Sequence, residues 1–322
     1  MQDIELLAFG PVPSRRLGRS LGINNVLWKT CTYSCVYCQL GRTNCMFIER
    51  RAFYEPKQVL AQVEKKIKEA KLRGERIDYI TFAPSGEPTL DVNLGKEISL
   101  LKSLGYPIAV ITNASLLWRS DVREDLLDAD YLSFKVDAIS RGLWKCINRP
   151  HGDLELGDIL DGIKDLSKTF KGSLVSETML IDSINYEGEL LRIANFLKSL
   201  SKLNKAYIAI PTRPPAEKWV RPAKEAIINE ALQIFVEKLG NDRVECLTSY
   251  EKNTFALTGD IERDLLSVAA AHPIRREAVI ELLKKANADW RVVERLLEEG
   301  KLVELEYRGT KYYVKRNLVA NS

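Results

Sequence analysis

The sequence predicts an α/β fold in which strands alternate with helices, and two observations lead to this class. Short apolar runs of strand length recur along most of the chain. Between them lie amphipathic runs whose apolar residues repeat with the helical period. Such alternation implies parallel strands joined by right-handed crossovers. Both a doubly wound open sheet and a barrel fit the pattern, so periodicity alone leaves that choice open.

Six strands are expected, and each is followed by a connection that contains a helix. The expected strands span residues 21–28, 77–83, 107–112, 131–136, 174–181 and 206–210. The expected helices run from Pro56 to a stop at Gly74 and lie near residues 93–104, 120–128, 155–170 and 187–200. Prolines and glycines break any helix before residue 21, and the alternation is expected to end between Val244 and Gly259.

The bulk composition is that of an ordinary globular protein. A length of 322 residues allows one large domain and a small one. The net charge of +4 is slight for this length, so electrostatics alone demands neither a nucleic-acid partner nor an anionic membrane. No apolar run reaches the roughly 18 residues of a membrane span, and the start MQDIELLAFG does not resemble a secretory signal. We therefore expect a cytoplasmic protein with no membrane partner.

Three of the six cysteines stand close together in the stretch TCTYSCVYCQ, where Cys31, Cys35 and Cys38 have the spacing C-x-x-x-C-x-x-C. Soft sulfur ligands at such spacing suit an iron–sulfur cluster or zinc, and both usually take four protein ligands. This motif supplies three. Spacing alone leaves two alternatives open: a zinc knuckle completed by Cys45, and a cluster that only carries electrons. Outside the motif, Cys45, Cys146 and Cys246 are each isolated and are by default expected to be inert buried thiols.

With Tyr37 just before the third cysteine, the segment resembles the signature of the radical S-adenosylmethionine superfamily. The resemblance implies a 4Fe-4S cluster on Cys31, Cys35 and Cys38, with the fourth iron open to the methionine moiety of S-adenosylmethionine. It implies that an electron from an external donor breaks a carbon–sulfur bond of this cofactor, and that a 5′-deoxyadenosyl radical then takes hydrogen from a substrate. It also selects a partial (β/α)6 TIM-like barrel, open on one side. The leader GPVPSRRLGRSLGI is similar to that of a subgroup often grouped with tRNA wyosine synthases.

In barrels the chemistry lies at the carboxyl ends of the strands, where the polar motifs of this chain are expected. The segment PSGEPTL at 84–90 resembles a G-G-E-P motif that binds the amino end of the methionine, although a serine replaces the first glycine. TNA at 112–114 resembles a T-N-G turn, and NRPH at 148–151 resembles a segment that faces substrate or cofactor. Lys135 and Asp137 would face one side of a strand, as cofactor ligands or as a satisfied ion pair. The residues so implied to bind the cofactor are Ser85, Gly86, Glu87, Asn113, Lys135, Asp137 and Arg149.

Several arginines are candidates for substrate binding. Arg15, Arg16 and Arg19 crowd one loop, and Arg213 lies in the proline-rich stretch PTRPP. Arginine presents paired donors to phosphate and carboxylate groups, so we single out Arg15, Arg16 and Arg213. A solvated surface cluster and a rigid connector are the alternatives. Glu177 could reach a cofactor hydroxyl or be accommodated at a strand edge.

The tail predicts a second, smaller domain. Helices are expected at 260–271, 275–285 and 289–300, followed by two strands around Arg308 and Gly309. Three helices and a hairpin resemble a winged helix, so we expect a barrel at 1–250 and a winged-helix-like domain at 260–322. The third helix carries at least as many acids as bases, whereas phosphate binding requires a net basic face. A protein-docking or lid role is therefore expected ahead of nucleic-acid binding.

We expect an enzyme that cleaves S-adenosylmethionine reductively and abstracts hydrogen from its substrate. The leading expectation for the substrate is tRNA or another nucleic acid, which rests on the subgroup resemblance and the appended domain. One alternative is a peptide or protein docked by the tail. Another is a nucleic-acid-binding regulator that senses redox state with its cluster.

Overall fold

A single open sheet organises residues 7–247 of the computed structural model, which describes residues 7–247, 260–271 and 273–316. The eight strands lie in the order β1-β2-β5-β6-β7-β8-β9-β10. β1 is antiparallel to β2, and the other neighbours run parallel. The strands are β1 (Ala8–Ser14), β2 (Gly18–Ile23), β5 (Tyr79–Phe82), β6 (Ile108–Thr112), β7 (Tyr131–Lys135), β8 (Ser173–Met179), β9 (Lys205–Ala209) and β10 (Val244–Leu247).

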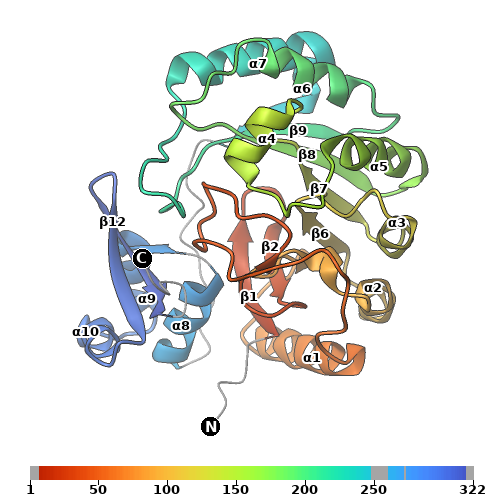
Figure 1. Ribbon diagram of the computed structural model, residues 1–322. Helices are drawn as coiled ribbons and strands as arrows, with labels where there is room; N and C mark the ends of the chain where they lie inside the picture. The colour runs from red at the N-terminus through yellow and green to blue at the C-terminus, as the bar shows by residue number, and fades with distance from the viewer. Residues whose placement is uncertain (1–6, 248–259, 272, 317–322) are drawn as a thin grey trace.

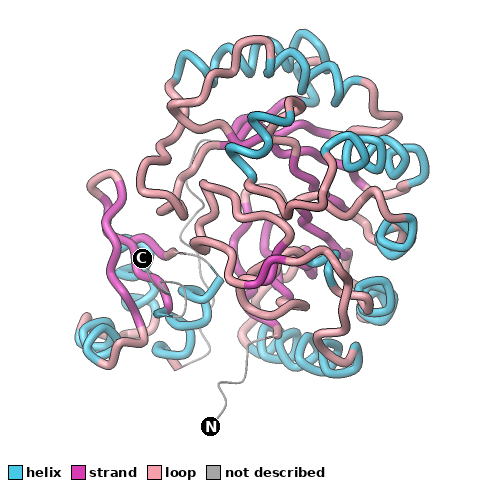
Figure 2. Tube along the Cα trace, in the orientation of Figure 1, coloured by secondary structure: helices cyan, strands magenta, loops and turns pink. Residues whose placement is uncertain are grey.

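The sheet curves into a partial barrel, as the sequence predicts. In the described part of the chain its edge strands β1 and β10 do not pair with each other, so the barrel stays open. Helices cover its outer face (Figures 1 and 2). They are α1 (Pro56–Leu72), α2 (Leu94–Lys102), α3 (Ser120–Leu126), α5 (Leu156–Thr169), α6 (Glu189–Lys198) and α7 (Glu225–Leu239). α4 (Arg141–Asn148) lies beside the long loop that follows β2.

Local sequence explains the helices, and α1 serves as the example. Pro56 occupies its first turn, where the missing N–H costs nothing. Val59, Val63 and Ile67 recur at helical spacing and are buried against the sheet. Beyond the helix end, Gly74 takes φ +67°, a left-handed conformation that a glycine adopts without penalty. The predicted helix from Pro56 to Gly74 is thus confirmed.

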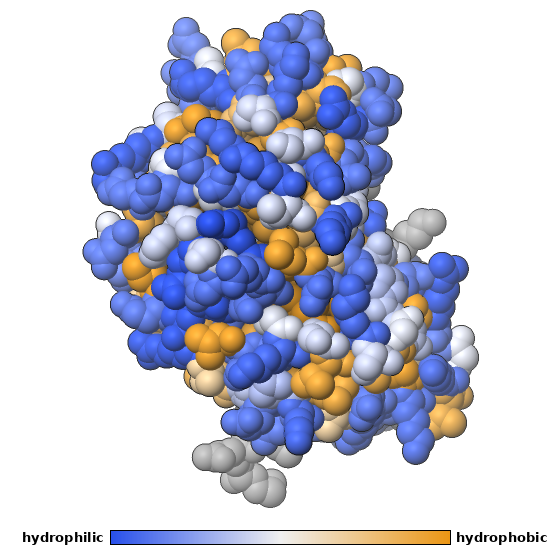
Figure 3. Space-filling view, turned by 90° about the vertical axis from the view of Figure 1, so that its right-hand side faces the viewer, coloured by the Kyte–Doolittle hydropathy of each residue, from blue (hydrophilic) through white to orange (hydrophobic). Residues whose placement is uncertain are grey.

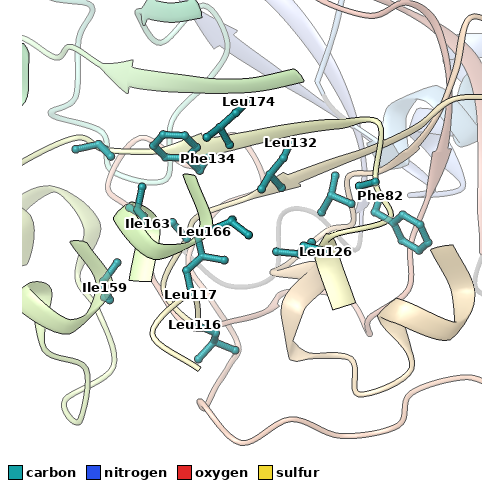
Figure 4. Packing of buried hydrophobic residues seen from close by; sticks show 14 of the residues in the cluster. Phe82, Leu116, Leu117, Leu126, Leu132, Phe134, Ile159, Ile163, Leu166 and Leu174 are labelled. Carbon is teal, nitrogen blue, oxygen red and sulfur yellow. The ribbon is translucent and has the colours of Figure 1, made fainter. Parts of the chain in front are cut away.

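The main core lies between the outer face of the sheet and the helices. Figure 4 shows strand residues such as Phe82, Leu132 and Phe134 packed against helix and loop residues such as Leu126 and Ile163. Alternate residues of the same strands point inward. On β7 these are Tyr131, Ser133 and Lys135, and Tyr131 belongs to a small apolar cluster inside the barrel. The polar groups of the inner face, such as Lys135, therefore come from strands whose alternate residues pack into the main core.

The chain after residue 260 forms a unit with its own core. It contains α8 (Ile261–Ala271), α9 (Arg276–Lys285), α10 (Arg291–Glu298) and a three-stranded antiparallel sheet in the order β11-β13-β12. The strands are β11 (Ile274–Arg275), β12 (Leu302–Tyr307) and β13 (Thr310–Lys315). The three expected helices and the hairpin around Arg308 and Gly309 are confirmed. The Tyr312 hydroxyl donates to the Thr212 carbonyl oxygen at 3.0 Å, which joins this unit to the barrel.

Three differences from the predicted elements have physical reasons. β2 begins and ends earlier than predicted, so residues 24–28 are loop. β1 was unexpected because Pro11 and Pro13 argue against a strand, yet an edge strand tolerates proline on its unpaired side. The predicted end of the alternation at Val244 is wrong, because α7 precedes it and β10 adds a parallel edge strand there. Residues 248–259, the rest of that predicted boundary, lie outside the described residues.

Among the described helices, none combines the length and the apolar character needed to span a membrane. The face turned to the viewer in Figure 3 carries mainly hydrophilic residues, with hydrophobic ones scattered between them.

Candidate active site

The three clustered cysteines lie on the loop between β3 (Thr30–Cys31) and β4 (Cys45–Met46). Main-chain hydrogen bonds fix this loop against the end of α4. The amide of Ser34 donates to the carbonyl oxygens of Asn148 and Arg149 at 3.1 and 3.0 Å, and the amide of Val36 donates to that of Ile147 at 2.9 Å. The geometry of the cysteine loop is therefore set by contacts more than 100 residues away along the chain.

Each of the three sulfurs has one hydrogen-bond donor from outside the motif. Asn113 Nδ2 lies 3.5 Å from the sulfur of Cys31, and Asn148 Nδ2 lies 3.5 Å from that of Cys35. Lys29 Nζ lies 3.7 Å from the sulfur of the third cysteine, Cys38. Donors to sulfur are the usual second layer around thiolate-bound metal centres.

The donor set fits a multinuclear cluster better than a single ion. In the portion of the chain that the structure describes, no three Cys, His, Asp or Glu side chains converge to hold one metal ion. Cys45, which would complete a zinc knuckle, is exposed. Cys146 is exposed as well, so the expectation that these isolated thiols are buried is wrong for both. In a 4Fe-4S cluster each thiolate binds its own iron, so the sulfurs can stand further apart. Burial raises the pKa of the Cys31 thiol to about 12; a bound metal would deprotonate it.

The PSGEPTL segment supports the start of the cysteine loop. The Ser85 carbonyl oxygen accepts from the Lys29 amide at 2.8 Å, and the Glu87 amide donates to the Thr30 carbonyl oxygen at 3.0 Å. A Cβ on Gly86 would lie 1.9 Å from that same Thr30 oxygen. Only glycine therefore permits the two backbones to lie this close.

The Glu87 carboxylate joins the ends of β5 and β6. Its Oε1 accepts from the Thr89 hydroxyl at 2.7 Å and from the Thr112 hydroxyl at 2.5 Å, and its Oε2 accepts from the Asn113 amide at 2.8 Å. Burial raises the pKa of Glu87, and these hydrogen bonds oppose the shift. Glu87 thereby orients the turn whose Asn113 side chain contacts Cys31.

Asp137 fixes the other side of the cysteine loop. Its Oδ2 accepts from the hydroxyl of Tyr37 and from Asn148 Nδ2, the latter at 2.7 Å, while its Oδ1 accepts from the Met179 amide at 2.9 Å. Tyr37 is buried, and this burial is the main cause that raises the pKa of its hydroxyl. The negative charge of Asp137 raises the pKa of Tyr37 further. The aromatic residue of the motif is thus a structural tie between the loop and β7.

A charged network crosses the inside of the barrel. Glu177 of β8 contacts Lys135 of β7 and accepts from Arg16 at 2.7 Å. Arg16 also donates to the Ser133 hydroxyl at 3.0 Å, and the Lys135 ammonium lies 5.3 Å from the Tyr37 ring centroid. Burial opposes the charge on Glu177, but Lys135 and Arg16 outweigh it and lower the pKa of Glu177 to about 2. Lys135 and Asp137 therefore both contact Tyr37, which agrees with the prediction that they face the same side of their strand.

The remaining predicted residues, Arg149, Arg213 and Arg15, contact other protein groups. Arg149 takes φ +45° and pairs with Glu217 at 2.5 Å; the same carboxylate binds Arg42 at 2.9 Å. Arg213 donates to the side chain of Gln39 at 2.9 Å, directly after Cys38. Arg15 donates to the Leu247 carbonyl oxygen at 2.8 Å, across the open side of the barrel. Their substrate and cofactor roles stay predictions.

Sequence reasoning missed two residues that the structure brings to this loop, Lys29 and Glu217. It named Asn148 within the NRPH motif but not its contact with Cys35. Lys29 stands two positions before the first cysteine, where nothing distinguishes it from a surface lysine. Glu217 carries no sequence signal, since its partners Arg42 and Arg149 are remote from it in the chain.

Comparison with known proteins identifies the family. The family model described as the radical SAM superfamily matches residues 25–197. A UPF0026 protein of Methanocaldococcus jannaschii is 47% identical over 310 residues, which cover 96% of each chain. An S-adenosylmethionine-dependent nucleotide dehydratase of Lacinutrix mariniflava is 25% identical over 307 residues, covering 89% of this chain and 59% of its own.

A solved structure agrees in fold. The crystal structure of a radical SAM methyltransferase from Sphaerobacter thermophilus superimposes with a TM-score of 0.53 at 15% identity, covering 71% of this chain and 67% of the other. That agreement supports the partial barrel. Together with the family match, it shows that the chain belongs to the radical SAM superfamily, whose enzymes use a 4Fe-4S cluster and S-adenosylmethionine.

Proposed function

We propose that Cys31, Cys35 and Cys38 hold a 4Fe-4S cluster and that the enzyme cleaves S-adenosylmethionine there to abstract hydrogen from a substrate. One observation carries the proposal: each of the three thiols has an N–H donor from a residue outside the motif, and two of these donors, Asn113 and Asn148, come from distant parts of the chain. When bound, the cluster supplies an electron and an open iron for the cofactor. An external electron donor must reduce it.

The surrounding residues would hold the loop and orient the cofactor. We assign the main chain of Ser85, Gly86 and Glu87 to the side of the loop where the cofactor binds. Because the Glu87 oxygens already accept from Thr89, Thr112 and Asn113, its carboxylate positions the turn rather than the ligand. We place Asn113, Lys135 and Asp137 on the barrel side of the sulfurs, facing the cofactor. Arg149 pairs with Glu217 and would act by bracing the loop.

Cysteine variants test the cluster assignment directly. After anaerobic reconstitution, we expect about four irons per chain and release of 5′-deoxyadenosine when dithionite and S-adenosylmethionine are added. Cys35→Ser should lose both, because two thiolates cannot retain the cluster. Cys45→Ser is the matched control and should keep both. Tetrahedral zinc in the wild-type protein, or loss of metal from Cys45→Ser, would refute the assignment.

We further propose a substrate that contains a nucleotide, with tRNA as the leading case. The support is the similarity to a relative named as a nucleotide dehydratase, and the leader grouped with tRNA wyosine synthases. Arg15, Arg16 and Arg213 are proposed to contact it. The test adds nucleotides or tRNA to the reconstituted enzyme and measures 5′-deoxyadenosine. A substrate should accelerate its release well above the uncoupled rate, and no effect from any nucleotide would count against this class.

A peptide or protein substrate is the second candidate, and the charges of the C-terminal unit favour it. We propose that residues 260–322 form a winged-helix-like domain separate from the barrel at 1–250. Several of its cations are paired with acids, as in Lys311 with Glu304 at 2.7 Å and Lys301 with Glu299 at 2.6 Å. Such pairs weaken phosphate binding. Retention of tRNA on a filter that falls steeply with salt would instead support a nucleic-acid role.

A further inference from the structure

Lys29 is a buried cation that has no acidic partner among the described residues. Its residue exposure is 4%, and the only other buried lysine among the described residues is Lys66, at 6%. Lys66 pairs with the Glu69 carboxylate at 3.1 Å. Lys29 instead contacts the Gly41 carbonyl oxygen and the sulfur of Cys38, and no carboxylate pairs with it in the described part of the chain. Burying an ammonium group without an anion is strongly unfavourable, so an anion is expected beside it.

The backbone directs the Lys29 side chain toward the cysteine loop. The residue takes φ +55°, a conformation that lysine rarely adopts. Its amide donates to the Ser85 carbonyl oxygen at 2.8 Å, and its carbonyl oxygen accepts from the amides of Asn44 and Cys45, each at 3.2 Å. Bonds on both sides of the residue thus hold a strained backbone in place. A strained residue that is held this firmly points to a function for its side chain.

We infer that Lys29 is the counter-charge of the thiolate-bound cluster and a positioning residue that raises its reduction potential. This rests on the proposed function. Three thiolates outweigh the positive charge of the cluster core, so the assembly is an anion, and one-electron reduction adds another negative charge. A fixed ammonium group beside Cys38 stabilises the reduced form more than the oxidised form. A weaker electron donor can then reduce this cluster. The same cluster without the lysine would need a stronger donor.

The two asparagines show that the arrangement is built around all three sulfurs. Asn113 Nδ2 is held by the Thr32 hydroxyl at 2.8 Å, and Asn148 Nδ2 is held by Asp137 at 2.7 Å. Each amide thus has a second acceptor that keeps it directed at its sulfur. These donors are neutral dipoles, whereas Lys29 brings a full charge. The effect on the potential should therefore be largest for Lys29.

The test is a redox titration of the anaerobically reconstituted full chain, followed by the electron paramagnetic resonance signal of the reduced cluster. Lys29→Met keeps the length of the side chain and removes the charge. At the midpoint potential of the wild-type cluster, we expect the ratio of reduced to oxidised cluster to fall about tenfold, which is about 59 mV for one electron. Lys29→Arg, which keeps the charge, should change the ratio by less than about twofold. Lys66→Met, the matched buried lysine, should also leave it unchanged.

Every outcome decides the inference. If Lys29→Met binds the full amount of iron and shows the same ratio of reduced to oxidised cluster as the wild type, the inference is wrong. It is also wrong if Lys66→Met shifts that ratio as much as Lys29→Met does. If Lys29→Met takes up no iron, normal uptake by Lys29→Arg supports the counter-charge, and failure of both variants shows a steric role instead. Iron content and signal of the wild-type protein are measured first, so a failure of the cluster assignment itself is seen before any variant is compared.

Discussion

Glu177 is predicted to stabilise the barrel through its charge, and the substitution Glu177→Gln tests this. The carboxylate lies between Lys135 and Arg16, with its side chain 10% exposed. These cations lower its pKa from 4.5 to about 2. At about 1.4 kcal/mol for each tenfold change in proton affinity, the charged form contributes about 3 kcal/mol to the free energy of unfolding at neutral pH. Glutamine has no charge and removes the carboxylate from between the two cations, so the loss should reach at least this value.

The pH dependence separates the charge effect from altered packing. Because the folded state lowers the pKa of Glu177, its contribution is complete above the unfolded value of 4.5 and disappears as the pH falls through about 2. Near pH 3 the contribution should have dropped to about 1.4 kcal/mol. The difference between wild type and Glu177→Gln should therefore shrink by about 2 kcal/mol between pH 7 and pH 3.

The assay is urea unfolding of the cluster-free chain at both pH values. Glu245→Gln provides the matched control, because Glu245 also lies on a barrel strand and pairs with a lysine, Lys205, at 2.6 Å. That pair is 38% and 44% exposed, so its loss should cost no more than about 1 kcal/mol. A difference for Glu177→Gln that stays constant from pH 7 to pH 3 would show that the charged network does not act as described.

Two further predictions concern the motifs next to the cysteines. Gly86→Ala should sharply lower the iron bound after anaerobic reconstitution, because its Cβ would lie 1.9 Å from the Thr30 oxygen; Gly142→Ala, with open space around it, should bind iron normally. Ala114 has φ +69°, and Ala114→Gly should change the free energy of unfolding by no more than about 1 kcal/mol. Glycine relieves about 1–2 kcal/mol of backbone strain. Against this stand about 0.8 kcal/mol for the lost burial of the methyl group and the greater freedom of the unfolded chain. Ala114→Val should lose at least about 2 kcal/mol in urea unfolding, since a β-branched residue fits this conformation poorly. Normal iron binding by Gly86→Ala, or an unchanged stability of Ala114→Val, would contradict these readings.

The fold could largely be predicted from the sequence because local patterns determine it. Apolar runs of strand length and amphipathic helices of ordinary size are visible in any window of the chain, and the six expected strands all exist. The failures occurred at the edges of the sheet. β1 carries prolines, and β10 places Glu245 and Cys246 in a strand of four residues. Edge strands contribute less apolar surface to the core, so their sequences carry a weaker signal.

The site could be predicted only in part, because its second layer depends on contacts that have no local pattern. The cysteines, Glu87 and Asn113 belong to short motifs and were found. The contact between Lys29 and Cys38 depends on how one short segment folds back on itself, and that between Asn148 and Cys35 exists only once the barrel has brought distant segments together. The same holds for Arg16, which reaches Glu177 from 161 positions away in the chain. Because it is an arginine, Arg16 could be singled out as a candidate for binding an anionic group. Nothing in the sequence indicates that its partner is Glu177.

The glycines of the two motifs illustrate how the structure explains departures from a family pattern. At position 86 a methyl group would collide with the backbone of the cysteine loop, and the chain keeps glycine there. At position 85 the residue contributes through its main chain, whose amide donates to the Asn24 side-chain oxygen at 3.1 Å, so a serine side chain is compatible. At position 114 only the positive φ favours glycine, and alanine adopts this angle at a cost of about 1–2 kcal/mol. The glycine that is retained is therefore the one whose loss would displace the cysteines.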